Sequence, residues 1–310
     1  MSTVNILFLG GAKRVSMARR FKEAAAALGR GCAVFSYELS LHEPIACEAT
    51  VIVGRRWNDP DVDADLRRVI AEHGISIVVP FVDGAVAVAA RLADAVFVPA
   101  STPQMAEAMF DKVIADAMFV QAGLPVPRWF GSQSECGRYI AKPRHGSASK
   151  GIVVCDSVEQ AAELALTDNY LVQEYIAARE EYTVDCYASV TSGQVLVACP
   201  RRRVEVIGGE VFRTVTVRDE AIEDLASEAV VRLGLRGAVT VQLLRDNTDG
   251  RLMLMEINPR LGGGAVCSVA AGADIPALIL REALGLPLDN PEWRPGVEIA
   301  RYPAEVVFYN

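Results

Sequence analysis

The chain has little of what several common classes of protein require. Only three histidines occur among its 310 residues, so a histidine-based zinc site is not expected. No apolar run approaches the roughly 20 residues that a membrane-spanning helix needs. The formal net charge of −8 argues against a general nucleic-acid-binding surface, which requires a basic face. The sequence therefore predicts neither nucleic acid nor a membrane as a partner.

The cysteines do not form a disulfide or metal-binding pattern. There are seven, an odd number, at wide spacings and without any C-x-x-C pair. The N-terminal residues do not resemble a secretory leader, so we expect reduced thiols and a cytoplasmic location. Most of these cysteines are expected to act as small apolar residues on strands.

Residues 1–100 alternate strand-like and helix-like patterns. Short apolar runs at 4–9, 32–37, 49–53 and 75–80 predict strands, and helical spacing marks 15–28 and 61–72. Such alternation predicts a parallel sheet covered by helices. The turn Gly10-Gly11 lacks the full G-x-G-x-x-G fingerprint, because Ala12 and Val15 stand where glycines are required. A tight turn is favoured over a dinucleotide site.

After Pro99 the pattern changes to that of an α+β region. A helix is predicted over 102–118, strands at 139–143, 151–155 and 171–175, and a helix over 157–166. Longer, mostly antiparallel strands follow at 180–190, 194–199, 239–244 and 252–257, with helices over 220–233 and 275–284.

The segment Met255-Glu256-Ile257-Asn258-Pro259-Arg260 carries the clearest chemical signal. Because side chains on a strand alternate faces, Glu256 and Asn258 point the same way. Carboxylate and amide oxygens with a cation just beyond suit Mg²⁺ bound to a polyphosphate. Gln242 on the preceding strand adds a further oxygen donor.

Two lysines and a small-residue loop are candidates for phosphate binding. Lys142 interrupts an apolar strand, where a buried lysine needs a counter-charge such as phosphate; an edge-strand lysine facing water is the alternative. The loop from His145 to Gly151, with Ser147 and Ser149, lets backbone N–H groups approach phosphate oxygens, although it is not a Walker A motif. Lys112 alone has the pattern of a surface lysine.

Several other polar residues are candidates with weaker signals. Glu174 suits an adenine amino group, the backbone of Ile176 the ring edge, and Glu181 the ribose hydroxyls. Arg203 and Arg213 are candidates for binding an anion. The alternative for the arginine triplet 201–203 is a solvated turn or strand edge. Asp83 lies where open α/β sheets place ligands and is a candidate for holding an amine or for capping a helix.

Taken in order, these motifs resemble the ATP-grasp superfamily, and most closely the ATP-binding halves of the carbamoyl phosphate synthase large subunit and related stand-alone ligases. The resemblance implies a Rossmann-like pre-ATP-grasp domain (1–100), a central lid subdomain with its linking helix (101–172) and a C-terminal ATP-grasp subdomain (173–310). It assigns the phosphates to Lys112 and Lys142, adenosine to Glu174, Ile176 and Glu181, metal ions to Gln242, Glu256 and Asn258, and the transferred phosphoryl group to Arg260. The lysines at 112 and 142 depart from the arginines common in carbamoyl phosphate synthase itself.

The implied activity is an ATP-dependent carboxylate–amine ligase that uses ATP and Mg²⁺ or Mn²⁺ and forms an acyl phosphate. Its partners are expected to be a small carboxylate and an amine, with amino acids among the candidates, and a homodimer through the first domain is a hypothesis. Three alternatives remain. They are a carbamoyl phosphate synthase-like enzyme that activates bicarbonate or carbamate, a catalytically silent nucleotide-binding protein, and a dinucleotide-dependent enzyme that uses Gly10-Gly11.

Overall fold

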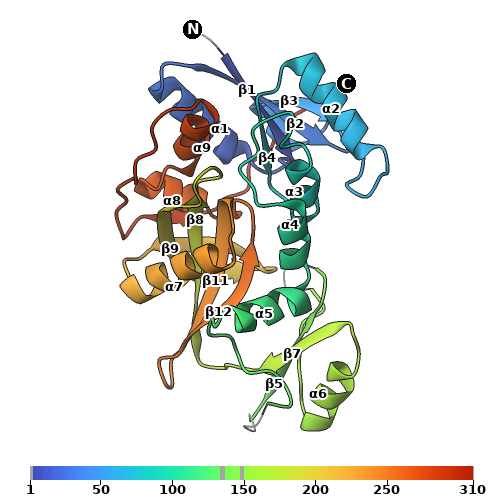
Figure 1. The fold of residues 1–310 in the computed structure, drawn as a ribbon, viewed down its shortest axis with the longest axis vertical. Coiled ribbons are helices and arrows are strands. Elements are labelled where there is room, and N and C mark those ends of the chain that lie inside the picture. Colours follow the sequence, from blue (N-terminus) through green and yellow to red (C-terminus); the bar gives the residue numbers. More distant parts are fainter. Residues whose placement is uncertain (1–2, 133–136, 147–149, 310) are drawn as a thin grey trace.

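The computed structural model describes residues 3–132, 137–146 and 150–309, and these form three β-sheets with helices packed around them. Figure 1 shows the sheets arranged along the long axis of the molecule. The first sheet lies at one end, the largest sheet in the middle, and the smallest at the opposite end. No helix in this described part is long and apolar enough to cross a membrane.

The first sheet is parallel, as the alternating pattern predicted. Its strands run in the order β3-β2-β1-β4 and comprise β1 (Thr3–Leu9), β2 (Gly31–Glu38), β3 (Thr50–Val53) and β4 (Ile77–Pro80). The helices of this region are α1 (Val15–Ala27), α2 (Val62–His73) and α3 (Asp83–Ala90), with a short 3₁₀ turn, η1 (Pro44–Cys47). Helix α3 follows β4 directly. Only the expectation that Asp83 caps a helix pointed to it, because its alanine- and valine-rich sequence has no clear amphipathic period.

The single helix expected over 102–118 is two helices. These are α4 (Pro103–Phe110) and α5 (Lys112–Gln121), and Asp111 separates them in an extended conformation. The Asp111 carboxylate accepts hydrogen bonds from the backbone N–H groups of Val113 and Ile114, so it caps α5. The apolar spacing continued through the break, which is why the sequence did not reveal it.

The smallest sheet has the order β6-β5-β7 and consists of β5 (Tyr139–Pro143), β6 (Val153–Val154) and β7 (Tyr170–Glu174). Helix α6 (Val158–Ala165) packs on β5 and β7. Strand β5 is therefore central and not an edge, which overturns the alternative of an edge lysine at position 142. Lys142 is only 8% exposed.

The largest sheet is antiparallel in the order β12-β11-β8-β9-β10-β13. Its strands are β8 (Arg179–Ala188), β9 (Val195–Ile207), β10 (Glu210–Thr216), β11 (Gly237–Asp246), β12 (Leu252–Asn258) and β13 (Glu298–Ala300). The associated helices are α7 (Glu220–Arg232), α8 (Val266–Ala271) and α9 (Ile275–Ala283). Strands β10, β13 and the second half of β9 were not predicted, because arginines and glutamates interrupt the apolar alternation there.

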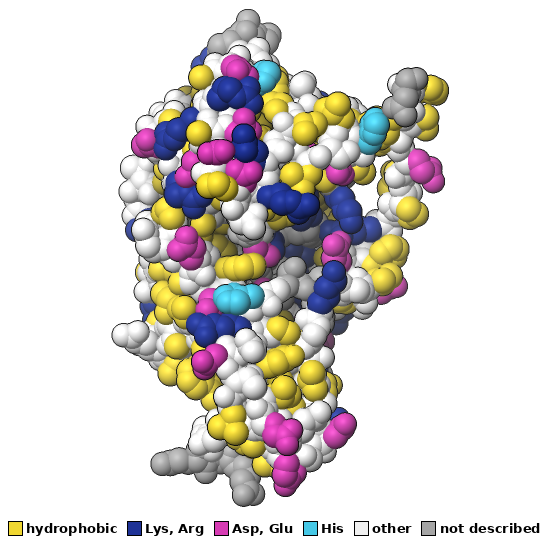
Figure 2. All heavy atoms as spheres, turned by 90° about the vertical axis from the view of Figure 1, so that its right-hand side faces the viewer, with side chains coloured by type: hydrophobic (Ala, Val, Ile, Leu, Met, Phe, Trp, Pro, Cys, Tyr) yellow, Lys and Arg dark blue, Asp and Glu magenta, His cyan; other side chains and the backbone are white. Residues whose placement is uncertain are grey.

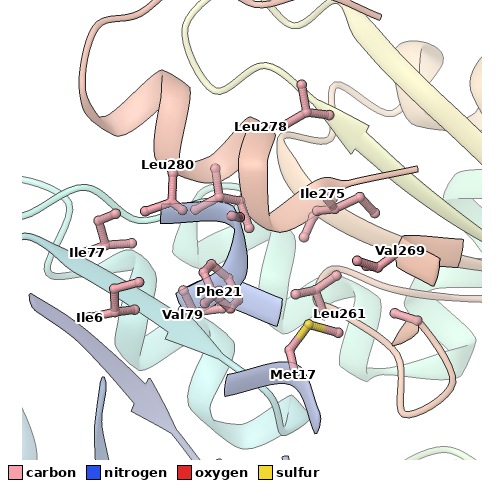
Figure 3. Close-up of a cluster of buried hydrophobic side chains, with 14 of the residues drawn as sticks. Ile6, Met17, Phe21, Ile77, Val79, Leu261, Val269, Ile275, Leu278 and Leu280 are labelled. Carbon is pink, nitrogen blue, oxygen red and sulfur yellow. The ribbon is translucent and has the colours of Figure 1, made fainter. Parts of the chain in front are cut away.

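An apolar core joins the first sheet to the C-terminal helices. Figure 3 shows Ile6 and Val79 of the first sheet together with Phe21 of α1, close to Ile275 and Leu280 of α9. These side chains belong to one cluster that also reaches Leu196 and Val197 on β9. The first and largest sheets are thus held together by a continuous core, which positions the loops of both around a shared cleft.

Candidate active site

A cleft of about 690 Å³ lies where the three sheets meet. Its walls include Asp83 at the start of α3, Lys142 on β5 and Glu256 on β12, so each sheet region contributes. Nine lysines and arginines but only four carboxylates line it. Figure 2 shows this hollow, with Lys and Arg side chains gathered in and around it. The excess of positive charge makes the cleft suited to a polyanion.

Strand register explains why distant residues converge on one wall of the cleft. Glu256 on β12 pairs with Gln242 on β11, Gln242 with Thr183 on β8, and Thr183 with Arg201 on β9. Directly paired residues in antiparallel strands point to the same face, so these four side chains form a row across the sheet. All four line the cleft.

Glu256 and Asn258 both line the cleft. No described residue forms a hydrogen bond or ion pair with the Glu256 carboxylate, while Asn258 Oδ1 accepts a bond of 3.2 Å from Arg260 Nη2. Gln242 lies beside Glu256, but its Oε1 accepts a bond of 3.2 Å from Arg203 Nη1. The donor set of one free carboxylate and two amides is of the hard-oxygen kind that Mg²⁺ prefers.

Arg203 is held between Gln242 and Glu181, and one of its nitrogens has no partner. Its Nε lies 3.6 Å from Glu181 Oε2, which is too long for a hydrogen bond. Among buried side-chain nitrogens and oxygens of the described residues, Arg203 Nε alone has no hydrogen-bond partner. Arg203 lines the cleft, and this buried nitrogen is able to donate a hydrogen bond to an anion bound there.

Lys142 is the most deeply buried lysine of the site. Its Nζ donates a 2.9 Å hydrogen bond to Gln173 Oε1, and Gln173 Nε2 donates a 3.0 Å bond to the buried Asp116. Burial lowers the pKa of Lys142, while the charges of Asp116 and Glu256 act in the opposite direction. With only an amide as its direct partner, Lys142 has capacity for an anion from the cleft.

Lys112 and Arg260 line the same cleft, each held by a contact from another segment. Lys112 begins α5, and its Nζ donates a 2.7 Å bond to the backbone oxygen of Gly146. Arg260 Nε donates a 2.6 Å bond to Asp83 Oδ1, at the first residue of α3. Asp83 was expected to hold an amine or to cap the helix, but Val82 is the N-cap and the Asp83 side chain binds Arg260.

Glu174 and Ile176 do not line the cleft, so the adenine contact expected for Glu174 is not supported. Glu174 is 4% exposed, and its carboxylate accepts hydrogen bonds from Arg128 and Arg251 at 2.7 to 3.3 Å. Burial opposes ionisation of Glu174, but these arginines outweigh it and lower its pKa to about 2. The Ile176 backbone oxygen accepts a 2.8 Å bond from Arg179.

The remaining candidates differ in where they lie. Ser147 and Ser149 fall outside the described residues. Arg213 does not line the cleft and pairs with Glu298 at 2.7 Å. The triplet 201–203 is not a uniform solvated edge, because Arg201 is 1% exposed and forms a buried ion pair with Asp185.

The dinucleotide alternative is weakened by Glu38, at the end of β2. Acidic residues after this strand bind ribose hydroxyls in dinucleotide folds. Here Glu38 accepts a 2.6 Å bond from Ser36 Oγ and hydrogen bonds from the backbone of Gly11 and Ala12. Its carboxylate therefore stabilises the glycine turn itself.

Several residues of the cleft region were not predicted from the sequence, among them Arg14, Arg301 and Gln173. Arg14 and Arg301 line the cleft, and Gln173 supports Lys142 from beneath. Arg14 and Arg301 lie in segments with no motif, whereas Gln173 directly precedes the candidate Glu174. Only the assembled fold brings the three residues to the cleft region. Arg14 lies three residues after Gly11 of the glycine turn, and this position was the one signal in the sequence that could have indicated it.

Comparisons with known proteins show which folds the structure resembles. The structure aligns with N5-carboxyaminoimidazole synthetase from Staphylococcus aureus complexed with ADP, at a TM-score of 0.75, 17% identity, and coverage of 95% of this chain and 82% of that one. A family model described as "ATP-grasp in the biosynthetic pathway with Ter operon" matches residues 167–304. The chain has the ATP-grasp fold. An L-amino acid ligase from Bacillus licheniformis gives a TM-score of 0.69 at 18% identity, covering 95% of this ATP-grasp chain and 78% of the ligase.

The predicted likeness to carbamoyl phosphate synthase is also confirmed. The large chain from Clavibacter michiganensis is 27% identical over 135 residues, which cover 40% of the ATP-grasp chain and 12% of that protein. The N-terminal section of the Methanopyrus kandleri large chain is 26% identical over 145 residues, covering 44% and 26% respectively. The matched segment thus spans only a small part of these relatives.

Proposed function

We propose that this protein is an ATP-dependent ligase that joins a carboxylate to an amine and releases ADP and phosphate. One observation carries the proposal: the unpartnered Glu256 carboxylate and Asn258 share a cleft with Lys112 and Lys142, which come from a different part of the fold. The carboxylate and amide oxygens can bind the metal ion, and the lysines can bind the phosphates of the nucleotide. The ligase and synthetase among the structural neighbours support the same function.

The donor set fits magnesium. Glu256 offers a free carboxylate, and Asn258 and Gln242 offer amide oxygens, with Gln242 turned toward Arg203 in this structure. Bound there, Mg²⁺ or Mn²⁺ would neutralise charge on the β- and γ-phosphates of ATP. Glu256 is proposed as the principal ligand, because its charge has no protein partner among the described residues.

The protein's own side chains bind and orient the reactants. Lys112 and Lys142 are proposed to hold phosphate oxygens, Glu181 the ribose hydroxyls, and Arg203 an anionic oxygen through its free Nε. Arg260, fixed by Asp83, is proposed to face the phosphoryl group in transfer. Catalysis then rests on positioning and charge neutralisation.

The reaction has two steps. A carboxylate oxygen attacks the γ-phosphorus, the bond from that phosphorus to the β–γ bridging oxygen breaks, and ADP leaves with the electron pair. The amine nitrogen then attacks the carbonyl carbon of the acyl phosphate, the C–O bond to phosphate breaks, and the nitrogen loses a proton. The closed cleft would protect the acyl phosphate from water.

We also propose the domain organisation implied by the resemblance. Residues 1–100 form a Rossmann-like pre-ATP-grasp domain, 101–172 the lid subdomain and 173–310 the C-terminal subdomain. The cytoplasmic location and a homodimer through the first domain stay predictions.

The test is ADP release from MgATP across pairs of small carboxylates and amines, amino acids included. The proposal predicts that ADP and amide form only when an acid and an amine are both present. Release of ADP with bicarbonate alone would instead favour the carbamoyl phosphate synthase-like alternative, which the 27%-identical relatives support. MgATP binding without ADP release across the panel would favour a silent nucleotide-binding protein.

A further inference from the structure

The turn Gly262-Gly263-Gly264 lies at the centre of a group of guanidinium ends. A Cβ placed on Gly263 would lie 2.9 Å from Arg301 Nη2 and 3.0 Å from Arg14 Nη1. A Cβ on Gly264 would lie 2.6 Å from Arg201 Nη1. Two arginines from opposite ends of the chain therefore meet within contact distance of one backbone position that has no side chain.

Arg14 has no anionic partner in the described part of the chain. Its guanidinium lies over the Phe81 ring, 5.8 Å from the ring centroid, and Nη2 donates a long bond of 3.5 Å to the Phe81 backbone oxygen. Arg14 is also the N-cap of α1, whose first turn contains no acidic residue. Burial, with the nearby charges of Arg260 and Arg301, lowers the pKa of Arg14 to about 10. Such a crowded, incompletely compensated cation is costly without a ligand.

The neighbouring Arg260 and Arg301, unlike Arg14, each bind a carboxylate of the protein. Arg260 is bound to Asp83, and Arg301 bonds to the Gly263 backbone oxygen and, at 3.1 Å, to Glu210. Of the four carboxylates that line the cleft, Glu256 and Glu181 lie on the proposed metal and nucleotide side. Only Glu210 and Asp83 are left to offset Arg14, Arg260 and Arg301. One net positive charge remains here, in addition to the lysines that serve ATP.

From this arrangement we propose that the acid substrate carries a second anionic group, a carboxylate or a phosphate, which is bound by Arg14 and Arg301 beside Gly263. This inference rests on the proposed ligase function, in which the first carboxylate is activated next to Arg260. Arg14 and Arg301 present forked donors suited to either oxyanion, and a side chain at position 263 would collide with both guanidinium ends.

The test measures binding of matched acids to the full-length protein loaded with MgADP, by calorimetry. The pairs are succinate with butyrate, glutarate with pentanoate, and 3-phosphoglycerate with glycerate. Within at least one pair the acid with the second anionic group should bind about tenfold or more tightly, as expected for a charge-assisted contact. Arg14→Gln and Arg301→Gln should each reduce that preference to about twofold or less. Lys13→Gln removes the same charge from the exposed neighbouring residue and should preserve the preference.

The outcomes separate this inference from the proposed function. If MgADP binds but no acid with a second anionic group binds better than its partner, the second subsite is refuted and the ligase proposal stands. A preference for the second anionic group that survives in both arginine variants refutes the subsite equally. If MgADP itself does not bind, the ligase proposal fails and this inference falls with it. Thermal unfolding of each variant verifies that the fold is retained, and the use of two separate arginine variants guards against misfolding of one.

Discussion

Arg260 Nε lies 2.6 Å from Asp83 Oδ1, and this ion pair joins two residues that are 177 positions apart. Asp83 begins α3 beside the first sheet, whereas Arg260 follows β12 of the largest sheet. Both side chains are mostly buried, at 14% and 17% exposed. The first domain therefore orients the arginine that we assign to the transferred phosphoryl group, and the pair is more than a surface salt bridge.

Asp83→Asn should lower the kcat for ADP formation while leaving the KM for ATP within about twofold. Arg260 would lose its ionic anchor, and misplacing a catalytic group commonly costs about tenfold to hundredfold in rate. Steady-state kinetics measures both constants. Asp94→Asn removes an exposed carboxylate that pairs with Arg67 and serves as the matched control. Equal kcat values for the two variants would show that Asp83 does not position Arg260.

Glu256→Gln should reduce ADP formation by about a hundredfold or more, because the proposed metal ligand loses its charge. The free energy of unfolding should change by less than about 1 kcal/mol, since no described residue bonds to this carboxylate. Activity as a function of Mg²⁺ concentration, with thermal unfolding in parallel, measures both. Glu72→Gln on the exposed side of α2 is the control. Turnover unchanged from the native protein would contradict the metal assignment.

Lys142→Met should weaken ATP binding by about tenfold to a hundredfold, because a charge-assisted contact to a phosphate oxygen is lost. Methionine keeps the length of the side chain and suits a buried position. Calorimetric titration with a non-hydrolysable ATP analogue gives the Kd. Lys13→Met, at an exposed residue outside the cleft, should bind as the native protein does. Native affinity in the Lys142 variant would place the triphosphate elsewhere.

The buried Glu174 makes acid stability a test of its structural role. Its pKa is about 2 in the folded protein, compared with 4.5 for the free side chain. Because the folded pKa is depressed, the stabilisation is complete above about pH 4.5 and is lost as the pH falls toward about 2. We expect Glu174→Gln to lower the free energy of unfolding at pH 7 by on the order of 2 kcal/mol, since both arginine partners are partly exposed and screened.

Urea unfolding at pH 7 and at pH 3 measures that dependence. The difference between native protein and Glu174→Gln should be smaller at pH 3. Glu163→Gln on the exposed face of α6 should show no such difference. If Glu174→Gln changed the affinity for ATP and not the free energy of unfolding, this result would instead support the adenine contact that the sequence led us to expect.

The sequence predicted the first sheet and the carboxylate–amide strand because both obey simple periodic rules. Apolar runs marked β1 to β4 to within about two residues, as expected where burial dictates pattern. The two-residue step placed Glu256 and Asn258 on one face. The position of a residue on a regular buried strand, and the face to which it points, can therefore be predicted from sequence alone.

Other features depended on contacts between distant segments and could not be predicted. Nothing local indicates that Glu174 is neutralised by Arg128 and Arg251, because Arg251 lies 77 residues away. The break at Asp111 was hidden by continuous apolar spacing on both sides. Arg14 and Arg301 meet only because the first sheet packs against the C-terminal helices. The motifs indicated the proposed metal donors and the proposed phosphate lysines, but not Arg14 and Arg301.

The most direct test of the account is a crystal structure of the protein with Mn²⁺ and a non-hydrolysable ATP analogue, using the anomalous signal of manganese. The account predicts a manganese peak bonded to Glu256 and Asn258, with triphosphate oxygens reaching Lys142. A triphosphate bound outside the cleft, or manganese coordinated away from Glu256, would contradict it.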